Sequence, residues 1–304
     1  MERIKVNEII AFLGSDVKNV IGPITNDIYV NNVSDPAHTN QYTLDWINKR
    51  LKEKQCMAEK SPAKVLICDD SVVYSSVLES SGKILIIVDN PRLCISKVID
   101  GFFLIKPQPG IHGSATIDEE AEIGKNVHVG AGCVIGKAKI GDNTVLMPNV
   151  VIYDNVTIGN SCLIQAGAII GTDGLGCQRE SDGTLVKFPH LGGVVVKDNV
   201  EIGANCQVAK GVLSDTIIGK GCKINGLCFI AHNCVLEDNV WITGNTMLCG
   251  SVHVGKNTTI FSSVIIRDQV SIGEKVTIGM GAVVTKNVPD GETWFGAPAH
   301  KKED

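Results

Sequence analysis

Aromatic residues are scarce in this chain of 304 residues, at 5% of the sequence, while 44% is hydrophobic and 32 residues are glycine. A core built from this composition is aliphatic, and many backbone positions must be tight turns or close contacts. No apolar run approaches the roughly 18 residues that cross a membrane, and Asn7 and Glu8 interrupt the apolar stretch at the start. We therefore expect a cytoplasmic, soluble protein with no membrane span and no cleaved leader.

Positive charge is not concentrated in any part of the sequence. The formal net charge is -5, and Lys and Arg are scattered along the chain. There is thus no basic stripe of the kind that neutralises nucleic-acid phosphates, and nucleic acid is not expected as a partner. The eleven cysteines include no CxxC pair, so a reducing compartment is the simpler interpretation. We expect no metal and no bound cofactor.

The first hundred or so residues carry mixed helix and strand patterns. Apolar residues at helical spacing predict a helix over residues 6–13, and the apolar runs 64–68 and 83–88 predict buried strands. Asn90-Pro91 predicts the start of a further helix. Together these patterns indicate a small α/β domain over residues 1–106.

From residue 111 an aliphatic residue returns every six positions. The positions are Ile111, Ile117, Ile123 and Val129, then after a one-residue slip Val134, Ile140, Leu146, Ile152, Ile158, Ile164 and Ile170, and later Val196, Ile202, Val208, Ile218, Ile224, Ile230, Leu236, Ile242, Leu248, Val254, Ile260, Ile266, Ile272, Ile278 and Val284. A six-residue unit cannot bury its own face, so three units must close a triangular coil and the coils must stack. The repeat predicts a mainly β protein, with a left-handed parallel β-helix over residues 111–299. The handedness follows from the repeat pattern and is an exception to the right-handed crossover rule.

Five cysteines share one position in the repeat, two residues before an aliphatic position, where strand alternation points the side chain inward. They are Cys162, Cys206, Cys222, Cys228 and Cys234. Threonine, valine and alanine hold the same position elsewhere, so the position requires only a small inward side chain. We interpret these thiols as packing residues and not as ligands.

Two stretches break the repeat. Residues 171–193 form an insertion too long to be a corner, and such loops carry function disproportionately. It contains His190, which can be either a ligand contact or a solvated loop residue. The second stretch, residues 208–218, has ten residues where twelve would keep the phase.

A β-helix has no internal cavity, so a site must lie on its outer surface. His232 comes two residues after an aliphatic position, near a corner, and Gly250 follows eighteen residues later. Three hexads make one coil, so Gly250 should stack beside His232 and leave room and a bare N–H next to the imidazole. Acyl transfer from a thioester to an amine needs a base for the amine proton and a donor for the oxyanion, and this pair supplies both. On spacing alone, a polar corner histidine without a role is the alternative.

Four segments are more specific than the repeat: IGTDGLG at 170–176, VEIGA at 200–204, SDTIIG at 214–219 and FIAHNC at 229–234. Together they resemble the UDP-3-O-acylglucosamine N-acyltransferases of lipid A synthesis, within the hexapeptide-repeat acyltransferases. The likeness covers most of the chain. It implies an N-acyltransferase that acylates the amine of a nucleotide-linked amino sugar, and a homotrimer with sites between subunits. It also implies an N-terminal domain that binds the uridine.

The resemblance also assigns roles to single residues on the β-helix. His232 matches the catalytic base and Gly250 the oxyanion-hole glycine. Asn225 stands where the family has an Asp that orients the imidazolium, and Asn can orient but cannot neutralise. The other positions that the resemblance places in the substrate pocket are Asp173, Gly174, His190, Asn233 and Gln269, the last of which aligns with a second family histidine.

In the N-terminal domain, Trp46-Ile47-Asn48-Lys49 is the nearest match to the motif that stacks uracil, which makes Trp46 and Asn48 candidates for substrate binding. A buried Trp46 is the alternative.

The donor is left open between acyl-CoA, acetyl-CoA and the thioester of an acyl carrier protein. The family carries a helical extension that engages acyl carrier protein, whereas this sequence continues after Val284 only to an ending with WFGAPA, like the CoA-dependent sugar acetyltransferases. A CoA-dependent acetyltransferase for surface-polysaccharide precursors is therefore a second reading. A non-catalytic hexapeptide protein that binds sugar nucleotides is a third, because Asn225 and Gln269 replace ionisable residues.

Overall fold

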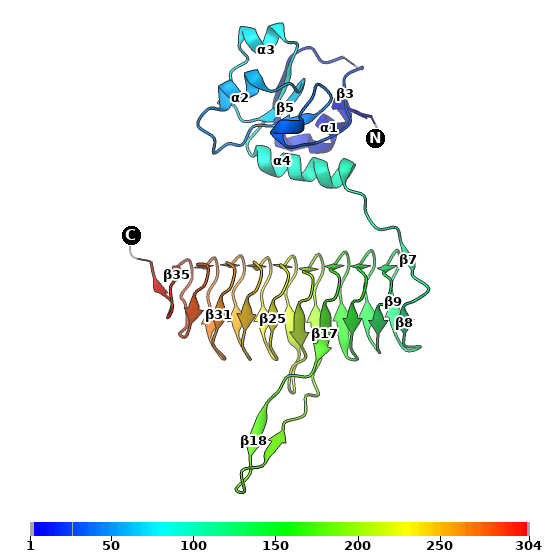
Figure 1. The fold of residues 1–304 in the computed structure, drawn as a ribbon, viewed down its shortest axis with the longest axis vertical. Coiled ribbons are helices and arrows are strands. Elements are labelled where there is room, and N and C mark those ends of the chain that lie inside the picture. The colour runs from blue at the N-terminus through cyan, green and yellow to red at the C-terminus, as the bar shows by residue number, and fades with distance from the viewer. Residues whose placement is uncertain (1–2, 26, 303–304) are drawn as a thin grey trace. The chain divides into compact units, whose positions relative to one another are not determined.

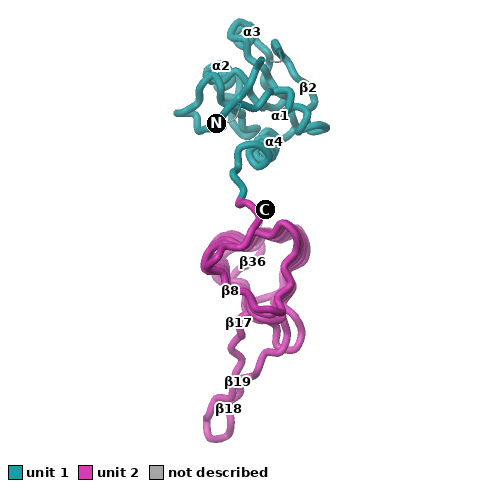
Figure 2. Tube along the Cα trace, turned by 90° about the vertical axis from the view of Figure 1, so that its right-hand side faces the viewer, with its two compact units in different colours: residues 1–106 teal, residues 107–304 magenta. Residues whose placement is uncertain are grey.

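The computed structural model describes residues 3–25 and 27–302, which fall into two compact units that divide between Lys106 and Pro107. Figure 1 labels the elements and Figure 2 colours the two units. Each unit has its own buried aliphatic core.

The first unit is built on a four-stranded sheet in the order β2-β6-β5-β4. β4, β5 and β6 run parallel, and β2 pairs antiparallel with β6. Side chains of β5 and β6 alternate between one core against α1 and α4 and another against α2 and α3, as expected for strands buried on both faces. The elements are β1 (Ile4–Lys5), α1 (Val6–Leu13), β2 (Val17–Ile21), β3 (Tyr29–Val30), β4 (Leu44–Trp46), α2 (Lys54–Lys60), β5 (Val65–Cys68), α3 (Ser76–Ser80), β6 (Ile84–Val88) and α4 (Pro91–Val98).

The expected elements of this unit are present. The helix over residues 6–13 is α1, which ends at Gly14 with φ at 51°. The two expected strands are β5 and β6, and the Asn90 side chain caps α4 by accepting a hydrogen bond from the Leu93 N–H. Of the helices in the described part of the chain, none has the length and apolar character needed to cross a membrane.

The second unit is a solenoid of three sheets, with eleven, nine and eight strands in the described residues (Figure 1). The eleven-stranded sheet contains β7 (Gly110–Ile111), β10 (His128–Val129), β13 (Val145–Leu146), β16 (Leu163–Ile164), β21 (Glu201–Ile202), β24 (Lys223–Ile224), β27 (Trp241–Ile242), β30 (Thr259–Ile260), β33 (Thr277–Ile278), β35 (Thr293–Phe295) and β36 (His300–Lys301). The nine-stranded sheet contains β8 (Thr116–Ile117), β11 (Val134–Ile135), β14 (Val151–Ile152), β17 (Ile169–Thr172), β22 (Gln207–Ala209), β25 (Phe229–Ile230), β28 (Met247–Leu248), β31 (Ile265–Ile266) and β34 (Val283–Val284). The eight-stranded sheet contains β9 (Glu122–Ile123), β12 (Lys139–Ile140), β15 (Val156–Ile158), β20 (Val194–Val196), β23 (Thr216–Ile218), β26 (Val235–Leu236), β29 (His253–Val254) and β32 (Ser271–Ile272). The prediction of a mainly β protein with a parallel β-helix after a small α/β domain is confirmed.

The aliphatic series is the row of side chains that points into the solenoid, with one correction. The slip expected before Val134 lies one position later, because Val134 is 45% exposed and Ile135 only 1%. Ile135 pairs in parallel register with Ile117 and Ile152, so the five-residue step falls after it. The corrected series is buried from the second coil onward.

The corners between the sheets have two separate requirements. Three residues after most of the inward aliphatic residues the backbone φ is near +60°. Asn, Ser or Gly holds most of these places, as at Asn126, Asn239 and Gly221, and the exceptions are Leu227, Gln269 and Lys275. The glycine that directly follows an aliphatic residue has another cause. A Cβ on Gly124 would lie 2.8 Å from the Asp142 nitrogen of the next coil, so this glycine permits the close approach of two coils.

The cysteines of the repeat are packing residues, as interpreted from the sequence. Cys162, Cys206, Cys222, Cys228 and Cys234 are buried and free. Each of the five thiols donates to a corner carbonyl of the next coil, for example from Cys222 to Glu237 at 3.1 Å and from Cys234 to Cys249 at 3.2 Å. Burial raises the pKa of Cys222 to about 11 and that of Cys234 to about 12, so both remain neutral thiols at pH 7.

Both breaks in the repeat lie at the same corner, where the chain passes from the nine-stranded to the eight-stranded sheet. Residues 171–193 leave this corner between β17 and β20 and form an antiparallel hairpin of β18 (Cys177–Arg179) and β19 (Leu185–Lys187), which projects from the solenoid in Figure 1. The second irregularity lies between β22 and β23, one coil further along. This corner is therefore structurally distinct from the other two.

Candidate functional site

His232 lies on this same corner in the next coil, between β25 and β26. The parallel register of β22, β25 and β28 places Lys210, His232 and Gly250 at equivalent places in three successive coils. The insertion of residues 171–193 begins in the coil before them. The sequence elements that break the repeat thus gather along one edge with the candidate base.

Gly250 lies directly against the His232 ring. A Cβ on Gly250 would be 2.6 Å from Cε1 and 2.7 Å from Nε2 of His232, closer than any side chain tolerates, so only glycine fits under the imidazole. Within the described ranges, the Gly250 N–H donates to no acceptor, while its neighbour Ser251 donates to the His232 carbonyl at 2.9 Å. An unpaired backbone donor therefore lies next to the ring.

The side chain of Asn233 orients the imidazole. Its Oδ1 lies 3.1 Å from His232 Nδ1 and also accepts a hydrogen bond from the Val212 N–H at 3.0 Å, while its Nδ2 donates to the Ser214 carbonyl. These contacts fix the amide oxygen toward the ring, so Nδ1 carries the proton and donates. His232 Nε2 is then the unprotonated nitrogen, with its lone pair available.

A second histidine packs edge-on against the first. The ring centroids of His190 and His232 are 5.4 Å apart at 77°. His190 is only 5% exposed, and its Nδ1 donates to the Phe188 carbonyl at 3.0 Å. Its Nε2 is buried without a hydrogen-bond partner and faces Gly174, where a Cβ would lie 2.6 Å away. An acceptor that is buried without a hydrogen bond lowers stability by about 1 to 3 kcal/mol. This nitrogen is therefore a candidate to accept a hydrogen bond from a ligand.

Asp173 ties the insertion to the corner. Its carboxylate pairs with Lys187 at 2.6 Å and with Lys210 at 2.8 Å. The hydrogen bonds from Lys187 and from Lys210 lower the pKa of Asp173 to about 2, so it is ionised at neutral pH. Both carboxylate oxygens are thus used within the chain, to hold β19 against the edge that carries His232.

Asn225 and Gln269 do not contact the His232 ring within one chain. Asn225 lies on another corner, between β24 and β25, where its Oδ1 accepts a hydrogen bond from the Gly226 N–H at 2.7 Å. With Trp241 and other residues it lines a groove of about 410 Å³. Gln269 lies on the same edge as His232, since its N–H donates to the Gly250 carbonyl at 2.9 Å, and its side chain is exposed.

The remaining two candidates belong to the first unit. Trp46 and Asn48 both line a pocket of about 480 Å³ whose lining includes Ile47, Leu51 and Met57. Trp46 is partly buried, packs on the core of α1 and α4 and also lines this pocket. The Asn48 side chain accepts a hydrogen bond from the Arg50 N–H at 3.0 Å.

Sequence reasoning missed Lys210 and the contact of Asn233 with the His232 imidazole. Asn233 was expected to touch substrate, yet its amide is fully engaged with His232, Val212 and Ser214. The signal for Lys210 was present in the sequence, since Lys210 precedes His232 by one coil of the register. The irregular step over residues 208–218 obscured that register. The coil from Val208 to Ile230 has 22 residues, whereas a regular coil has three hexads.

The arrangement can accept a proton and stabilise a negative charge at adjacent points. His232 Nε2 is the acceptor, and the Gly250 N–H is a donor with no other partner. Within residues 3–25 and 27–302, no group of three or more His, Cys, Asp or Glu side chains is arranged to hold a metal ion.

Two family models match the solenoid. A model of the bacterial transferase hexapeptide (six repeats) matches residues 137–172, and a model of the hexapeptide repeat of succinyl-transferase matches residues 251–286.

Relatives match almost the whole chain. A protein of Francisella tularensis subsp. holarctica named UDP-3-O-acylglucosamine N-acyltransferase 1 is 34% identical over 294 residues, covering 90% of this chain and 83% of its own. The UDP-3-O-acylglucosamine N-acyltransferase of Coxiella burnetii is 30% identical over 281 residues, with 84% and 79% covered. Among solved structures, a UDP-N-acetylglucosamine acyltransferase from Campylobacter jejuni matches with a TM-score of 0.57 and 29% identity, covering 64% of this chain and 74% of that chain.

The contact between Gly250 and His232 leads to a structural prediction. Gly250→Ala should displace the His232 ring by about 1 Å or change its rotamer, because a new methyl group needs roughly 3.5 Å from ring atoms and has 2.6 Å. A crystal structure of the variant measures the displacement. Gly113→Ala is the control, since its Cβ would meet nothing within 4 Å. An unmoved ring beside a seated alanine would contradict the described contact.

Proposed function

The chain belongs to the family of UDP-3-O-acylglucosamine N-acyltransferases, and on this premise we propose that it moves an acyl group from a thioester to the amine of a nucleotide-linked amino sugar, with His232 as the general base. It is an acyltransferase, and the family membership supports a UDP-sugar as the acceptor. The observation that carries the proposed mechanism is the free Nε2 of His232 beside the free N–H of Gly250.

The proposed reaction begins when the sugar amine attacks the thioester carbonyl carbon and a C–N bond forms. His232 Nε2 takes a proton from the attacking nitrogen, and the imidazolium keeps its other proton on Nδ1, held by Asn233. Collapse of the tetrahedral intermediate breaks the C–S bond, and the imidazolium returns the proton to the leaving sulfur. The products are an amide and a free thiol, and His232 is neutral again.

Negative charge on the carbonyl oxygen develops in the same step. The Gly250 N–H is the donor proposed to stabilise it, since it has no acceptor in the described chain and lies beside the base. Such a donor is typically responsible for a factor of about 10² to 10³ in kcat. It is a backbone group, so its role requires that residue 250 be small enough to leave His232 in place.

The insertion is proposed to complete the sugar and acyl pocket. His190 Nε2 is proposed to accept a hydrogen bond from the acceptor substrate when Gly174 and its neighbours shift to admit it. Asp173 is proposed to act by holding the insertion and Lys210 in place. Gln269, one coil beyond Gly250, and the Asn233 corner are proposed to border the same pocket.

The first unit is proposed to bind the nucleotide. The lining of this pocket includes the Trp46 indole and the Asn48 amide, groups that suit a uracil ring. Its contribution would be binding energy for the acceptor. The chemical step needs only the groups on the solenoid.

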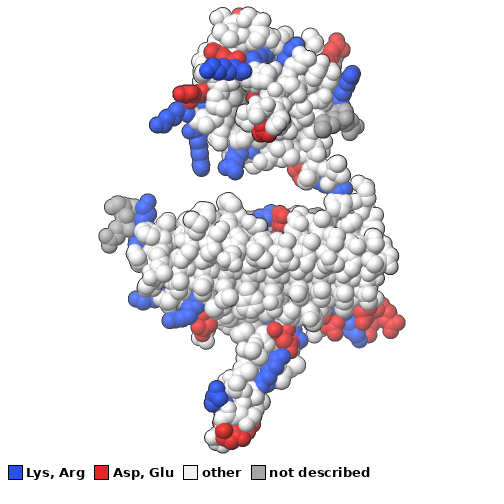
Figure 3. All heavy atoms as spheres, in the orientation of Figure 1, with Lys and Arg blue, Asp and Glu red and all other residues white. Residues whose placement is uncertain are grey.

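Homotrimer formation is proposed from the outer face of the nine-stranded sheet. Figure 3 shows few charged side chains on the solenoid face turned to the viewer. The outward side chains of that sheet include Phe229, Met247 and Ile265, the last two 43% and 44% exposed. An exposed apolar strip of this length is typical of an interface. In such an assembly, Asn225 of a neighbouring copy is proposed to face His232, in the place where the family has an Asp.

We expect His232→Ala to lower kcat by about 10² to 10⁴, because the amine proton loses its acceptor. The assay follows amide formation from UDP-amino sugars, with acyl-CoA, acetyl-CoA and acyl carrier protein thioesters tested in parallel. His253→Ala is the matched control, since His253 lies on β29, away from the His232 corner, and pairs with Glu237 at 3.2 Å. Full activity of a folded His232→Ala variant would exclude the proposed base.

We expect His190→Ala to lower kcat/KM about 10- to 100-fold, the loss expected for one hydrogen bond in a buried place. His190→Gln should recover part of this loss, because its amide oxygen is also an acceptor. Thermal unfolding of both variants is the control. If His190 only fills space, Ala and Gln will differ in stability and not in kcat/KM, and the substrate contact is then wrong.

Light scattering on the full chain should give three times the chain mass of 32.4 kDa. Met247→Lys together with Ile265→Lys should shift the mass toward one copy and lower activity, because charges would be buried in the interface. Thr259→Lys, an outward change on the eleven-stranded sheet, is the control. A monomeric wild-type chain with full activity would contradict the assembly.

A further inference from the structure

The corner between β24 and β25 carries Asn225-Gly226, the only Asn-Gly dipeptide in the sequence. Asparagine is one of the chemically labile residues of proteins, because the main-chain nitrogen of the next residue can attack its side-chain amide. A glycine in the next place favours this attack, since it has no Cβ to hinder the approach of its nitrogen. Every other asparagine of the chain precedes a residue with a side chain.

The two groups that must react are already in contact at this corner. Asn225 Oδ1 accepts a hydrogen bond from the Gly226 N–H at 2.7 Å, so the nitrogen lies beside the side-chain amide. Within the described residues, this N–H has no other acceptor, and Asn225 Nδ2 makes no hydrogen bond. The attacking nitrogen and the leaving amide group are therefore not held by other partners.

The main chain on either side of these groups is fixed by the neighbouring coils. The Asn225 N–H donates to the Ile242 carbonyl at 2.9 Å. The Leu227 N–H donates to the Ala204 carbonyl, also at 2.9 Å. These bonds hold the backbone in place while leaving the Gly226 nitrogen free, so the contact with the Asn225 side chain is built into the fold.

Glycines in the coils before and after leave space around the dipeptide. A Cβ on Gly203 would lie 2.3 Å from the Gly226 nitrogen, and a Cβ on Gly244 would lie 3.8 Å from Asn225 Nδ2. Asn225 is exposed, and with Gly226 it lines the groove of about 410 Å³. Water can therefore reach the reacting atoms, and ammonia can leave.

We propose that Asn225 is a deamidation site of this chain. The Gly226 nitrogen loses its proton to water and attacks Asn225 Cγ, and a C–N bond forms. The bond from Cγ to Nδ2 breaks, and Nδ2 leaves as ammonia after gaining a proton. Water then opens the cyclic imide at either of its carbonyls, which gives aspartate or isoaspartate. The balance is one water consumed and one ammonia released, and a neutral amide becomes a carboxylate.

The consequence for catalysis rests on the proposed function, in which Asn225 of one copy faces His232 of another. An amide can orient the imidazole, but it cannot neutralise the imidazolium that forms when His232 takes a proton. A carboxylate at position 225 stabilises that imidazolium by its charge. Conversion to aspartate therefore raises the rate of the proposed reaction as the protein ages.

Mass spectrometric peptide mapping of the folded full chain, incubated at mildly alkaline pH in water labelled with heavy oxygen, tests the modification. The peptide with Asn225 should lose ammonia and gain a labelled oxygen, an increase of about 1 Da beyond the label itself. Asn245-Thr246 is the control within the chain, because it lies at the same corner in the next coil. Conversion at Asn225 should be roughly tenfold faster or more.

Two variants test the role of the contact. Gly226→Ala should slow the conversion roughly tenfold, because the new Cβ hinders the nitrogen. That Cβ would lie 3.0 Å from the Ala204 carbonyl oxygen, so thermal unfolding checks the fold. Asn225→Gln keeps Gly226 and should remain unconverted. Conversion of the folded wild-type chain no faster than at Asn245, or conversion only after unfolding, would overturn the site.

The Asn225→Asp variant tests the effect on activity. Its kcat should exceed that of unconverted wild type about tenfold, because the imidazolium gains a counter-charge. Wild-type activity should rise with the fraction of aspartate formed. Equal rates would overturn the catalytic consequence. The mapping needs no substrate, so a chain that deamidates and transfers no acyl group would refute the proposed function and leave the deamidation site standing.

Discussion

The stacking of one coil on the next at a fixed register is the interaction on which the rest of the solenoid depends. Backbone N–H groups at the corners donate to carbonyls of the adjacent coil, as from Gly141 to Ile158 at 2.8 Å. Coils that approach so closely leave no space for a Cβ at positions such as Gly124. The same register places Gly250 under His232, so the constraint that builds the fold also brings the proposed base and the proposed oxyanion donor together.

Departures from the repeat create the chemistry. A regular corner carries short polar side chains and forms no recess in the surface. At the corner of His232, the two preceding coils add the insertion and the irregular turn, which supply His190, Lys210 and the partners of Asn233. The result is a buried histidine with an unused nitrogen next to a histidine with a defined tautomer. Neither feature exists at the other two corners of these coils.

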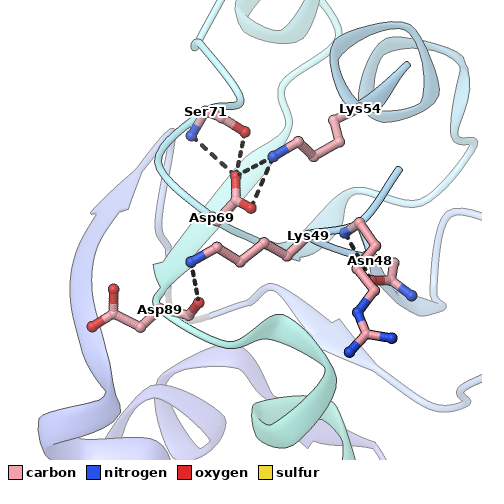
Figure 4. A network of polar contacts seen from close by, with 7 residues as sticks. Asn48, Lys49, Lys54, Asp69, Ser71 and Asp89 are labelled. Atoms are coloured by element: carbon pink, nitrogen blue, oxygen red, sulfur yellow. Dashed lines mark hydrogen bonds and ion pairs between the residues drawn. The ribbon is translucent and has the colours of Figure 1, made fainter. Parts of the chain in front are cut away.

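In the first unit, some charged side chains form ion pairs within the chain, and others have no carboxylate partner in the described residues. Asp69 with Lys54 (Figure 4), and Asp89 with Lys18, are ion pairs complete within the chain. Arg50 and Arg92 are left over beside the pocket of Trp46. Both arginines lie near the carboxyl ends of the parallel strands, beside residues proposed to bind the nucleotide.

The sequence alone was sufficient for most of what depends on periodicity. The six-residue repeat predicted the three-sided solenoid, the inward cysteines and the stacking of His232 with Gly250, because a strict period maps directly onto position in a coil. It placed the slip at Val134 one residue early, since two adjacent valine and isoleucine residues satisfy the pattern equally and only burial separates them. The orienting contact of Asn233, the buried Nε2 of His190 and the ion pairs of Asp173 could not be read from the pattern. They arise where the chain leaves its period, and there the neighbours of a side chain are set by the path of the loops in space.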